Sequence, residues 1–290
     1  MTILACIPAY NEGRVIGTLV SNVLQYVDNV IVCDDGSNDD TSIEAEKMGA
    51  VVLKHEKNLG KGAALRTLFD FAKKNQAEII ITIDGDGQFF PEEIPKLIKP
   101  IQDQGIDIVI GYRSNKDEMP SYRKIGNKFL DSMTNLASEL PYRDTQSGFR
   151  SYSKKAISCI QFKTNGFGAD SEILIDASRK NLVISEVGVR VRYNTGEKTS
   201  TKDPISHTGE VVTSLIESIA IRHPLKYLGI PGFLLTIIGV SFGIWSILIF
   251  NEVRSFNIPI LVTAVGSTIL GTMLLLMSVV LYGISKIRSY

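Results

Sequence analysis

Two aspartates flank a glycine at Asp84-Gly85-Asp86, directly after the mostly apolar run from Ile79 to Ile83. Carboxylate oxygens are the ligands that hard divalent cations such as Mg²⁺ and Mn²⁺ prefer, and these ions also carry phosphates. In an extended segment alternate side chains share one face, so Asp84, Asp86 and the amide oxygen of Gln88 are predicted to meet one ion. A solvated turn is the ordinary explanation of an isolated Asp-x-Asp pattern, so the metal interpretation depends on what lies beside it.

Similar clusters follow two earlier runs of the same kind. Residues 8–13 read Pro-Ala-Tyr-Asn-Glu-Gly, and residues 34–41 read Asp-Asp-Gly-Ser-Asn-Asp-Asp-Thr. The carboxyl ends of parallel strands meet at one edge of a sheet, and ligands bind there. The three clusters are therefore predicted to converge, which favours a metal and phosphate site over a solvated turn at residues 84–88.

The runs that precede these clusters alternate with helical stretches. We expect strands at Ile3–Pro8, Asn29–Cys33, Ala50–Lys54, Ile79–Ile83 and Asp107–Gly111. Helical spacing of apolar residues predicts connecting helices between the first two runs, at Val15, Leu19, Val23 and Leu24, and at residues 63–73. This alternation predicts an α/β fold with a mainly parallel sheet covered by helices. The sequence has no G-x-G-x-x-G after the first strand and no G-x-x-x-x-G-K-[ST], so a glycine-rich phosphate loop is not expected.

The charges are unevenly distributed, although 31 Lys and Arg balance 31 Asp and Glu. From His223 onward four basic residues and one acidic residue give +3, which leaves −3 for the first 222 residues. A nucleic-acid-binding protein needs clustered positive charge, so this class is disfavoured and no nucleic-acid partner is expected. Cys6, Cys33 and Cys159 lack metal-like spacing, and we expect small buried thiols in a reducing compartment.

Two stretches near the C-terminus, residues 228–250 and 255–285, carry no charge. About 20 apolar residues span a bilayer core, so a two-helix transmembrane hairpin is predicted, with spans at about 228–250 and 259–284 and a turn at residues 251–254. A pair of buried core helices is the alternative. More Lys and Arg flank the ends of the hairpin than its turn. The positive-inside bias therefore predicts an integral membrane protein with both termini and the N-terminal domain in the cytoplasm. Residues 1–7 show no signal-peptide pattern.

Residues 208–224 carry an apolar helical stripe that includes Val211, Leu215 and Ile219. We expect an interfacial amphipathic helix in contact with membrane lipid, with packing against the sheet as the alternative. In the first span Gly239 and Gly243 form a G-x-x-x-G motif, through which the hairpin is able to pack against a copy of itself as a homo-oligomer. The expected organisation is a catalytic domain at 1–207, the interfacial helix at 208–224 and the hairpin at 225–290.

A series of motifs resembles, in order, those of family 2 glycosyltransferases with the Rossmann-like GT-A fold. They are Ile7–Glu12, Asp34–Ser37 with Asp39 and Thr41, Asn58–Gly62, Asp84–Gln88, Gly111–Arg113 and Asp144–Arg150. The last two are similar to those of dolichol-phosphate mannose synthase and other polyprenyl-phosphate glycosyltransferases. The resemblance covers roughly residues 1–222, and members of this family also carry membrane spans, in differing number.

The resemblance implies a nucleotide pocket walled by Pro8, Tyr10 and Glu12, with Asp35 at the base or ribose. It places Lys61 at a phosphate beside a helix N-terminus, which attracts anions. Each has an ordinary structural explanation as well. Pro8 ends a strand, Glu12 suits the dipole of a following helix, and Lys61 is a solvated lysine.

The resemblance also places Asp84 near the sugar and the metal, with Asp86 and Gln88 as further ligands of Mn²⁺ or Mg²⁺. Arg113, Arg123 and Arg150 are candidates for clamping phosphate, because a guanidinium group binds phosphate oxygens bidentately. Glu172 is expected to face the sugar or to orient the acceptor phosphate, unless it is simply an acid at a helix start.

The acceptor side in this family includes a basic segment after the last strand. Here Arg190 and Arg192 alternate with Val189 and Val191, and Tyr193 stands where an arginine is expected. A lipid phosphate is already anionic near neutral pH, so the reaction has little need of a general base. The three histidines, His55, His207 and His223, lie outside the acidic motifs and are expected at the surface or in packing.

These observations predict a membrane-anchored inverting glycosyltransferase, a hexosyltransferase that moves one sugar from a nucleotide sugar to polyprenyl (dolichyl) phosphate for glycan or glycoprotein assembly. GDP-mannose, UDP-glucose and UDP-N-acetylhexosamine remain open as donors. One alternative is a processive or other-acceptor glycosyltransferase, although the Gln-x-x-Arg-Trp motif of processive synthases is absent and the single tryptophan, Trp245, lies in the first span. The other is a non-catalytic nucleotide-binding membrane module.

Overall fold

The computed structural model describes residues 2–114, 121–138, 141–166, 168–192, 224–255 and 257–287. The chain folds as two compact units, Met1–Leu215 and Ile216–Tyr290. The predicted interfacial helix at 208–224 lies outside the described residues apart from Pro224, so it and the predicted domain limits stay predictions.

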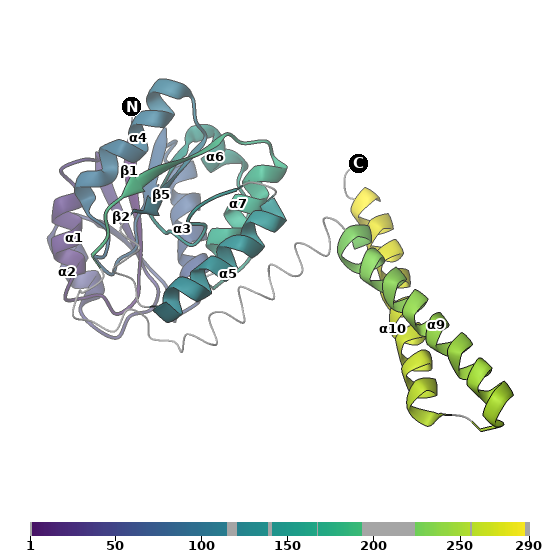
Figure 1. The fold of residues 1–290 in the computed structure, drawn as a ribbon. Helices are drawn as coiled ribbons and strands as arrows, with labels where there is room; N and C mark the ends of the chain where they lie inside the picture. Colours follow the sequence, from purple (N-terminus) through teal and green to yellow (C-terminus); the bar gives the residue numbers. More distant parts are fainter. Residues whose placement is uncertain are drawn as a thin grey trace. The chain divides into compact units, whose positions relative to one another are not determined.

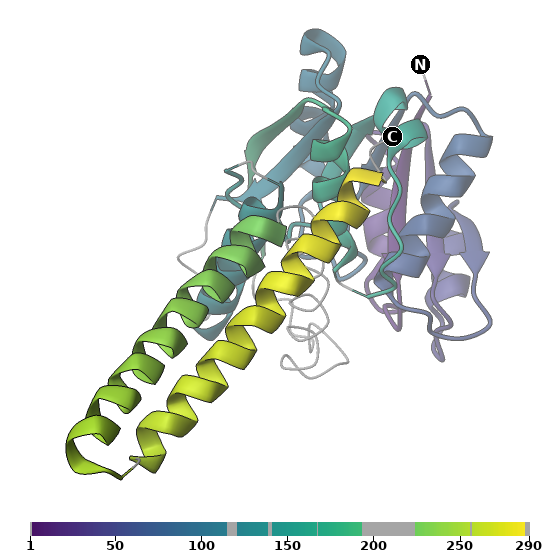
Figure 2. The same cartoon turned by 90° about the vertical axis from the view of Figure 1, so that its right-hand side faces the viewer.

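A seven-stranded sheet forms the centre of the first unit, in the order β3-β2-β1-β4-β6-β5-β7 (Figures 1 and 2). The strands are β1 (Ile3–Ala9), β2 (Asn29–Asp34), β3 (Val51–Lys54), β4 (Ile79–Thr82), β5 (Ile108–Arg113), β6 (Arg150–Ser153) and β7 (Ile184–Val189). The pairs β1–β2, β1–β4, β2–β3 and β5–β7 are parallel, whereas β6 runs antiparallel to β4 and β5. The predicted mainly parallel sheet is confirmed, and the five predicted strands are all present.

Helices cover both faces of this sheet (Figure 1). They are α1 (Ile16–Val23), α2 (Thr41–Lys47), α3 (Lys61–Lys74), α4 (Ile94–Gln104), α5 (Ser121–Ser138), α6 (Lys154–Cys159) and α7 (Ala169–Arg179), with a 3₁₀ turn η1 (Pro91–Glu93). Alternate residues of a strand point to opposite faces. Ala5 and Ile7 of β1 therefore pack with α1, α2 and α4, while Leu4 and Cys6 pack with α3, α6 and α7. This GT-A-like arrangement buries both faces of the sheet.

The register of the strands brings three loops to one edge. Ala9 is level with Asp34 at the end of β2, and Cys6 is level with Thr82 at the end of β4. Because β1, β2 and β4 are parallel neighbours, the segments that follow them begin side by side. The acidic clusters at residues 34–41 and 84–88 therefore stand at the same edge as the loop after β1.

The second unit is a pair of long apolar helices, α9 (Ile230–Val253) and α10 (Ile258–Ile287), preceded by a π-helical turn η3 (Leu225–Gly229). The segments Leu225–Val253 and Ile258–Ile284 have mean hydropathies of 2.4 and 2.1 and are long enough to cross a membrane. Only 11% of the most apolar window of each is buried, which argues against the alternative of core helices. The predicted turn at 251–254 is wrong in its start, because α9 continues through Val253 and ends at Arg254, which has φ 56°.

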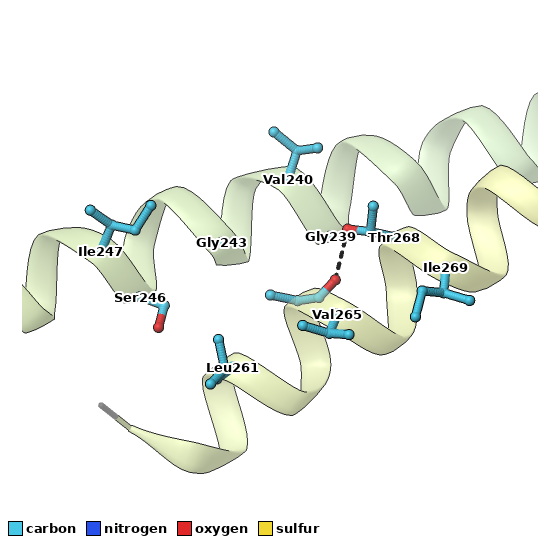
Figure 3. Close-up of a pocket in the computed structure, with 10 residues that line it drawn as sticks. Gly239, Val240, Gly243, Ser246, Ile247, Leu261, Val265, Thr268 and Ile269 are labelled. Carbon is cyan, nitrogen blue, oxygen red and sulfur yellow. Dashed lines mark hydrogen bonds between the residues drawn. The ribbon is translucent and has the colours of Figure 1, made fainter. Parts of the chain in front are cut away.

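Small residues let the two helices approach closely near Gly239 (Figure 3). A Cβ at Gly239 would lie 2.5 Å from the backbone nitrogen of Thr268, and the Thr268 hydroxyl donates to the Ala264 carbonyl at 2.7 Å. One turn further along, a Cβ at Gly243 would meet no atom within 4 Å, and a groove of about 360 Å³ opens between the helices. Gly239 is thus used for packing inside the hairpin, so the G-x-x-x-G motif is not open as a whole for pairing with a copy. Oligomer formation stays a prediction.

Candidate active site

The loops that follow β1 and β2 are joined by hydrogen bonds. Three backbone N–H groups after β1 donate to side chains after β2: Asn11 to Ser37 Oγ (2.9 Å), Glu12 to Thr41 Oγ1 (2.8 Å) and Gly13 to Asp39 Oδ2 (3.0 Å). Burial alone would raise the pKa of Asp39, but its hydrogen bonds from Thr41 and Gly13 lower it. Pro8, Tyr10 and Glu12, the predicted pocket wall, are partly buried at this junction.

The two aspartates at the end of β2 are buried, and donors surround their carboxylates. Asp34 accepts the Ser37 N–H (2.8 Å) and contacts the Ser42 hydroxyl. Asp35 accepts the N–H groups of Leu59 (3.0 Å) and Gly60 (2.7 Å), and its Oδ1 lies 2.7 Å from His55 Nδ1. These carboxylates fix the loops around them, and three of the acceptor positions of Asp35 are already used.

The segment after β4 brings two carboxylates together. Asp84 Oδ1 lies 2.8 Å from the Lys61 ammonium. Burial, and next the charge of Asp84, raise the pKa of Asp86 to about 6, although the Gln88 N–H, Lys61 and Arg113 act in the opposite direction. The ionised form of Asp86 is therefore less favoured than that of an ordinary aspartate, and additional positive charge nearby would stabilise it.

The predicted extended geometry of residues 84–88 is wrong. The chain turns at Gly87, which has φ 67°, and the Gln88 N–H folds back to Asp86 Oδ1 at 3.0 Å. Alternation therefore does not place Gln88 beside the two aspartates. The backbone carbonyl of Gln88 accepts the Arg192 N–H at 2.9 Å. The side chain of Gln88 stays a predicted metal ligand.

Asp84 is held against the loop that leads into β6. A Cβ at Gly148 would lie 2.4 Å from both carboxylate oxygens of Asp84, so any larger residue would displace this side chain. The neighbouring Thr82 hydroxyl donates to the Gly148 carbonyl at 2.9 Å. The glycine of the Gln-Ser-Gly-Phe-Arg motif thus sets the position of a predicted metal ligand.

Lys61 opens α3 and bridges two acids, Asp84 at 2.8 Å and Asp170 at 2.9 Å. Burial would lower the Lys61 pKa, but the charges of Asp170 and Asp84 raise it. At the N-terminus of α3 the N–H groups of Gly62 (2.7 Å) and Ala63 (3.3 Å) donate to the Asn165 carbonyl, so these two donors are already used. The phosphate contact of Lys61 stays a prediction. Lys61 itself remains beside Asp84, with its charge shared between two carboxylates.

The first turn of α7 separates Asp170 from Glu172. Asp170 is buried and faces Lys61, whereas the carboxylate of Glu172 accepts the N–H groups of Lys163 (3.1 Å) and Thr164 (2.8 Å). Glu172 is therefore not brought to Asp84, and it fixes the loop before α7. These amide contacts favour the structural alternative for Glu172, and its role at the sugar or the acceptor phosphate stays a prediction.

Arg113, at the end of β5, binds Asp144 in a two-point ion pair. Its Nε and Nη2 each lie 2.7 Å from an oxygen of the Asp144 carboxylate, which is fully buried. Arg113 is also close enough to Asp86 to lower its pKa. The fork that was predicted to clamp phosphate is thus engaged by Asp144, while its charge still acts on the Asp86 site.

Arg150 is fully buried, so its predicted role as a phosphate clamp is wrong. Its guanidinium donates to three carbonyls, those of Ser147 (2.8 Å), Asp170 (2.8 Å) and Thr145 (2.7 Å). These bonds join the loop before β6 to α7, and so fix Asp170 and Gly148. The side chain of Arg123, on α5, lies outside the part of the chain that the structure describes.

The basic segment after β7 lies beside the acidic loop. Val189 and Val191 are buried, and the exposed Arg190 and Arg192 both stack on the Phe90 ring, at 5.4 and 5.0 Å, as the predicted alternation requires. Arg190 also donates to Glu93 at 2.9 Å. Two guanidinium groups therefore stand next to the loop that carries Asp84 and Asp86.

The donor set at the end of β4 suits a hard divalent cation. Lys61 contacts Asp84 and Asp170 and acts electrostatically on Asp86, Arg150 lies 4.0 Å from Asp170, and Arg113 is paired with Asp144. Three carboxylates therefore share the two positive charges of Lys61 and Arg150, and negative charge is in excess. Mg²⁺ and Mn²⁺ sites commonly take one or two carboxylates from the protein and the rest from substrate phosphates and water. Among the described residues no group of three His, Cys, Asp or Glu side chains is arranged to hold a metal ion.

A comparison with known families and proteins identifies the chain. The family model described as glycosyl transferase family 2 matches residues 4–161, more than half of the chain. The chain belongs to glycosyl transferase family 2. It is 35% identical, over 64% of its length and 84% of the relative's, to the UDP-N-acetylglucosamine–dolichyl-phosphate N-acetylglucosaminyltransferase of Methanococcus voltae. It is 29% identical, over 72% of its length and 90% of the relative's, to the dolichyl-phosphate hexose transferase of Haloferax volcanii.

The fold of this glycosyltransferase has relatives among solved structures. The crystal structure of glucosyl-3-phosphoglycerate synthase from Mycobacterium tuberculosis in complex with Mn²⁺, UDP and glucosyl-3-phosphoglycerate matches with a TM-score of 0.59. That match has 24% identity and covers 76% of this chain and 78% of the other. At 24% identity, this similarity shows a shared fold only.

Two residues that the sequence did not single out contact predicted site residues: Asp170 pairs with Lys61, and His55 contacts Asp35. Asp170 shares one helical face with the buried Ile173, Leu174 and Ala177, so the i, i+3, i+4, i+7 pattern pointed it inward and left Glu172 off that face. His55 directly follows β3, and the rule that ligands gather beyond the carboxyl ends of strands applied there too.

Proposed function

We propose that this glycosyltransferase transfers a single sugar from a nucleotide sugar to a polyprenyl (dolichyl) phosphate and inverts the anomeric configuration. The observation that carries the proposal is the cluster of Asp84, Asp86 and Asp170 around Lys61, where negative charge is in excess. The relatives that act on dolichyl phosphate and the two helices long enough to span a membrane support the lipid acceptor.

Asp84 and Asp86 would hold Mg²⁺ or Mn²⁺, with Gln88 as a further candidate. When bound, the cation supplies Lewis-acid stabilisation of the charge on the departing diphosphate. Lys61 adds a second positive charge beside Asp84, and Asp170 fixes that ammonium in place. Arg113 contributes its charge next to Asp86 while Asp144 holds its fork.

The group transfer needs no proton acceptor. An oxygen of the lipid phosphate forms a bond to the anomeric carbon, and the bond from that carbon to the diphosphate oxygen breaks on the opposite face. The nucleoside diphosphate leaves with the bonding electron pair. The lipid phosphate is already an anion, so a general base has little to contribute. The residues of this chain are then needed for orientation and charge, with Arg190 and Arg192 beside the acidic loop as candidates for meeting the acceptor phosphate.

We further propose a uridine nucleotide as donor. A carboxylate has about four acceptor positions, and Leu59, Gly60 and His55 use three of those of Asp35. One remaining position suits the single imide N–H of uracil better than the paired N–H donors of guanine. The name of the Methanococcus voltae relative, which is 35% identical, supports the same base. The sugar is left open.

For the membrane, we propose that α9 and α10 anchor the enzyme with both termini and the catalytic unit in the cytoplasm. Arg222, Lys226, Lys286 and Arg288 flank the ends of the hairpin, against Arg254 at its turn. This asymmetry supports the orientation through the positive-inside bias. The same basic residues would meet anionic headgroups near the acceptor.

The test is a donor panel with one acceptor. Purified full-length protein in detergent is incubated with dolichyl phosphate, Mn²⁺ or Mg²⁺, and radiolabelled UDP-glucose, UDP-N-acetylglucosamine or GDP-mannose. We expect an organic-soluble product carrying one sugar from a UDP donor, and its loss when EDTA is added. A product that grows with time on a gel would favour a processive synthase. Tight donor binding by calorimetry with no product from any donor would favour a binding module.

A further inference from the structure

His55 is fixed by contacts on both ring nitrogens. Nδ1 lies 2.7 Å from Asp35 Oδ1, and Nε2 lies 2.9 Å from the Thr67 hydroxyl on α3. The backbone N–H of His55 donates to the Asp34 carbonyl at 2.9 Å, and the side chain is 12% exposed. The imidazole therefore joins the residue after β3 to the end of β2 and to α3.

The partner on Nδ1 fixes which nitrogen carries the proton. An ionised carboxylate only accepts hydrogen bonds, so Nδ1 must donate to Asp35. Nε2 then accepts from the Thr67 hydroxyl when the ring is neutral, or donates to it when the ring is charged. The contact with Asp35 survives in both states, so it acts as a permanent support.

Asp35 in turn holds the two residues that come directly before α3. Its Oδ1 accepts the Leu59 N–H at 3.0 Å and its Oδ2 accepts the Gly60 N–H at 2.7 Å. Its own N–H donates to the Ala9 carbonyl at 2.9 Å, which ties the same residue to β1. Residues 59 and 60 are thus held by one carboxylate whose orientation depends on His55.

Lys61 comes next in the chain. Its ammonium reaches Asp84 at 2.8 Å and Asp170 at 2.9 Å, with only 11% of the side chain exposed. A shift of the backbone at residues 59 and 60 would move the Lys61 Cα directly, and with it the charge beside Asp84. A continuous path of contacts therefore runs from His55 through Asp35 and two backbone amides to the acidic site.

We propose that His55 is a positioning residue of this site, which acts through Asp35 to set Lys61 against Asp84. It touches neither the proposed metal nor the sugar. The effect on the reaction rests on the proposed function, whereas the effect on residues 59 and 60 does not. The carboxylate of Asp35, without the Nδ1–H donor, is free to rotate away from the amides that it now holds.

Two substitutions separate the two ring contacts. In His55→Asn the side-chain amide nitrogen lies near the place of Nδ1 and keeps a donor for Asp35. In His55→Gln it lies near the place of Nε2, where it keeps the contacts with Thr67 and Cys33 but leaves Asp35 without this donor. We expect kcat to fall about 10- to 100-fold in His55→Gln, since misplacement by about 1 Å costs up to about 100-fold. His55→Asn should stay within about threefold of the wild type, on the same scale. The KM for the lipid phosphate should not change in either variant.

A second readout is independent of turnover. Hydrogen exchange of the Leu59 and Gly60 amides, measured on the full-length protein in detergent, should become faster in His55→Gln and stay near the wild-type rate in His55→Asn. Unchanged exchange at both amides in His55→Gln overturns the proposal, as does an equal loss of kcat in the two variants. If the wild type makes no glycolipid but the exchange result holds, the proposed function fails while the support by His55 stands.

The wild-type protein provides a measurement that needs no variant, in case His55→Gln does not fold. Nitrogen-15 NMR of labelled histidine distinguishes a protonated from an unprotonated Nδ1. A protonated Nδ1 in the neutral ring, with a slowly exchanging hydrogen, supports the proposal. An unprotonated Nδ1 in the neutral ring overturns it, because no hydrogen bond to Asp35 would then exist.

Discussion

The carboxyl ends of β2 and β4 stand at the same edge of the sheet and both carry a close pair of aspartates, but their surroundings differ. Around Asp34 and Asp35, backbone N–H groups and hydroxyls from residues 37, 42, 59 and 60 satisfy the oxygens. Asp84 is paired with Lys61 at 2.8 Å, and burial together with the charge of Asp84 raises the pKa of Asp86 to about 6. The β2 pair is held mainly by hydrogen bonds from the framework, with one acceptor position of Asp35 left for the proposed base. The β4 pair has a mutual repulsion that a bound cation would relieve.

The largest effect that this difference predicts is on Asp86. Asp86→Asn removes a ligand charge from the β4 pair, and we expect turnover to fall about 1,000-fold, the loss typical of a deleted charge-stabilising group. Stability without metal should stay equal or rise, because one of two repelling charges is gone. Initial rates and thermal melting with and without Mn²⁺ measure both. A Mn²⁺-dependent rise in melting temperature in the wild type should disappear in the variant, and its persistence would contradict the assignment.

Gly148→Ala tests the same pair without touching a carboxylate. A Cβ at this position would lie 2.4 Å from both oxygens of Asp84, so the side chain must move. We expect kcat to fall about 100-fold, as for other displacements of about 1 Å. Gly17→Ala is the matched control, because its Cβ would lie 3.4 Å from the nearest atom, in helix α1. Equal activity in the two alanine variants would show that the position of Asp84 is not critical.

At the β2 end the expected effect is on stability. Asp34→Ala leaves the partly buried N–H of Ser37 and the partly buried hydroxyl of Ser42 without their acceptor. A buried unsatisfied donor costs about 1–3 kcal/mol, so the free energy of unfolding should fall by about 2–3 kcal/mol. Urea unfolding of the full-length protein in detergent measures this. The exposed Asp70→Ala on α3 is the control and should change the free energy by less than about 0.5 kcal/mol. If Asp34→Ala lost activity while its free energy of unfolding stayed near that of the wild type, Asp34 would have to be assigned to the active site.

The smallest expected effect concerns Asp39, at the tip of the β2 loop. Its pKa in the folded protein is lowered below 3.8, so its stabilising contribution is present above that pH and is lost as the pH falls through the lowered value. Asp39→Asn should weaken this acid dependence by less than about 1 kcal/mol, since the side chain is exposed and solvent screens its interactions. Unfolding curves from pH 5 to pH 3, compared between wild type and variant, give the difference. A steeper acid dependence in the variant would contradict the lowered pKa.

The sheet and the hairpin were predictable because their patterns are local. Short apolar runs marked β1 to β5, and the uncharged stretches marked α9 and α10. Strand β6 carried no such pattern, since its first residue is the buried Arg150 and its other residues are Ser-Tyr-Ser. It becomes a strand because it pairs with both β4 and β5, which lie far from it in sequence.

The roles of the charged residues were less predictable, because they depend on partners from other loops. Arg113 and Arg150 have the residue type of a phosphate clamp, but Asp144 and three backbone carbonyls occupy their donors. Glu172 and Asp170 are two residues apart, yet one binds backbone amides and the other binds Lys61. The amino-acid type alone does not distinguish a clamp from a framework contact.

The sequence by itself determined the parallel sheet, the acidic strand ends that must share one edge, and the apolar hairpin. These follow from the side-chain period of strands and helices and from the cost of placing charge in a bilayer, which act between neighbours in the chain. Only the tertiary structure decided which carboxylates accept hydrogen bonds from the surrounding loops and which keep a negative charge that neighbouring cations do not fully balance. That outcome depends on contacts such as Lys61 with Asp170, 109 residues apart, whose geometry exists only when the loops from β2, β4 and α7 are in place.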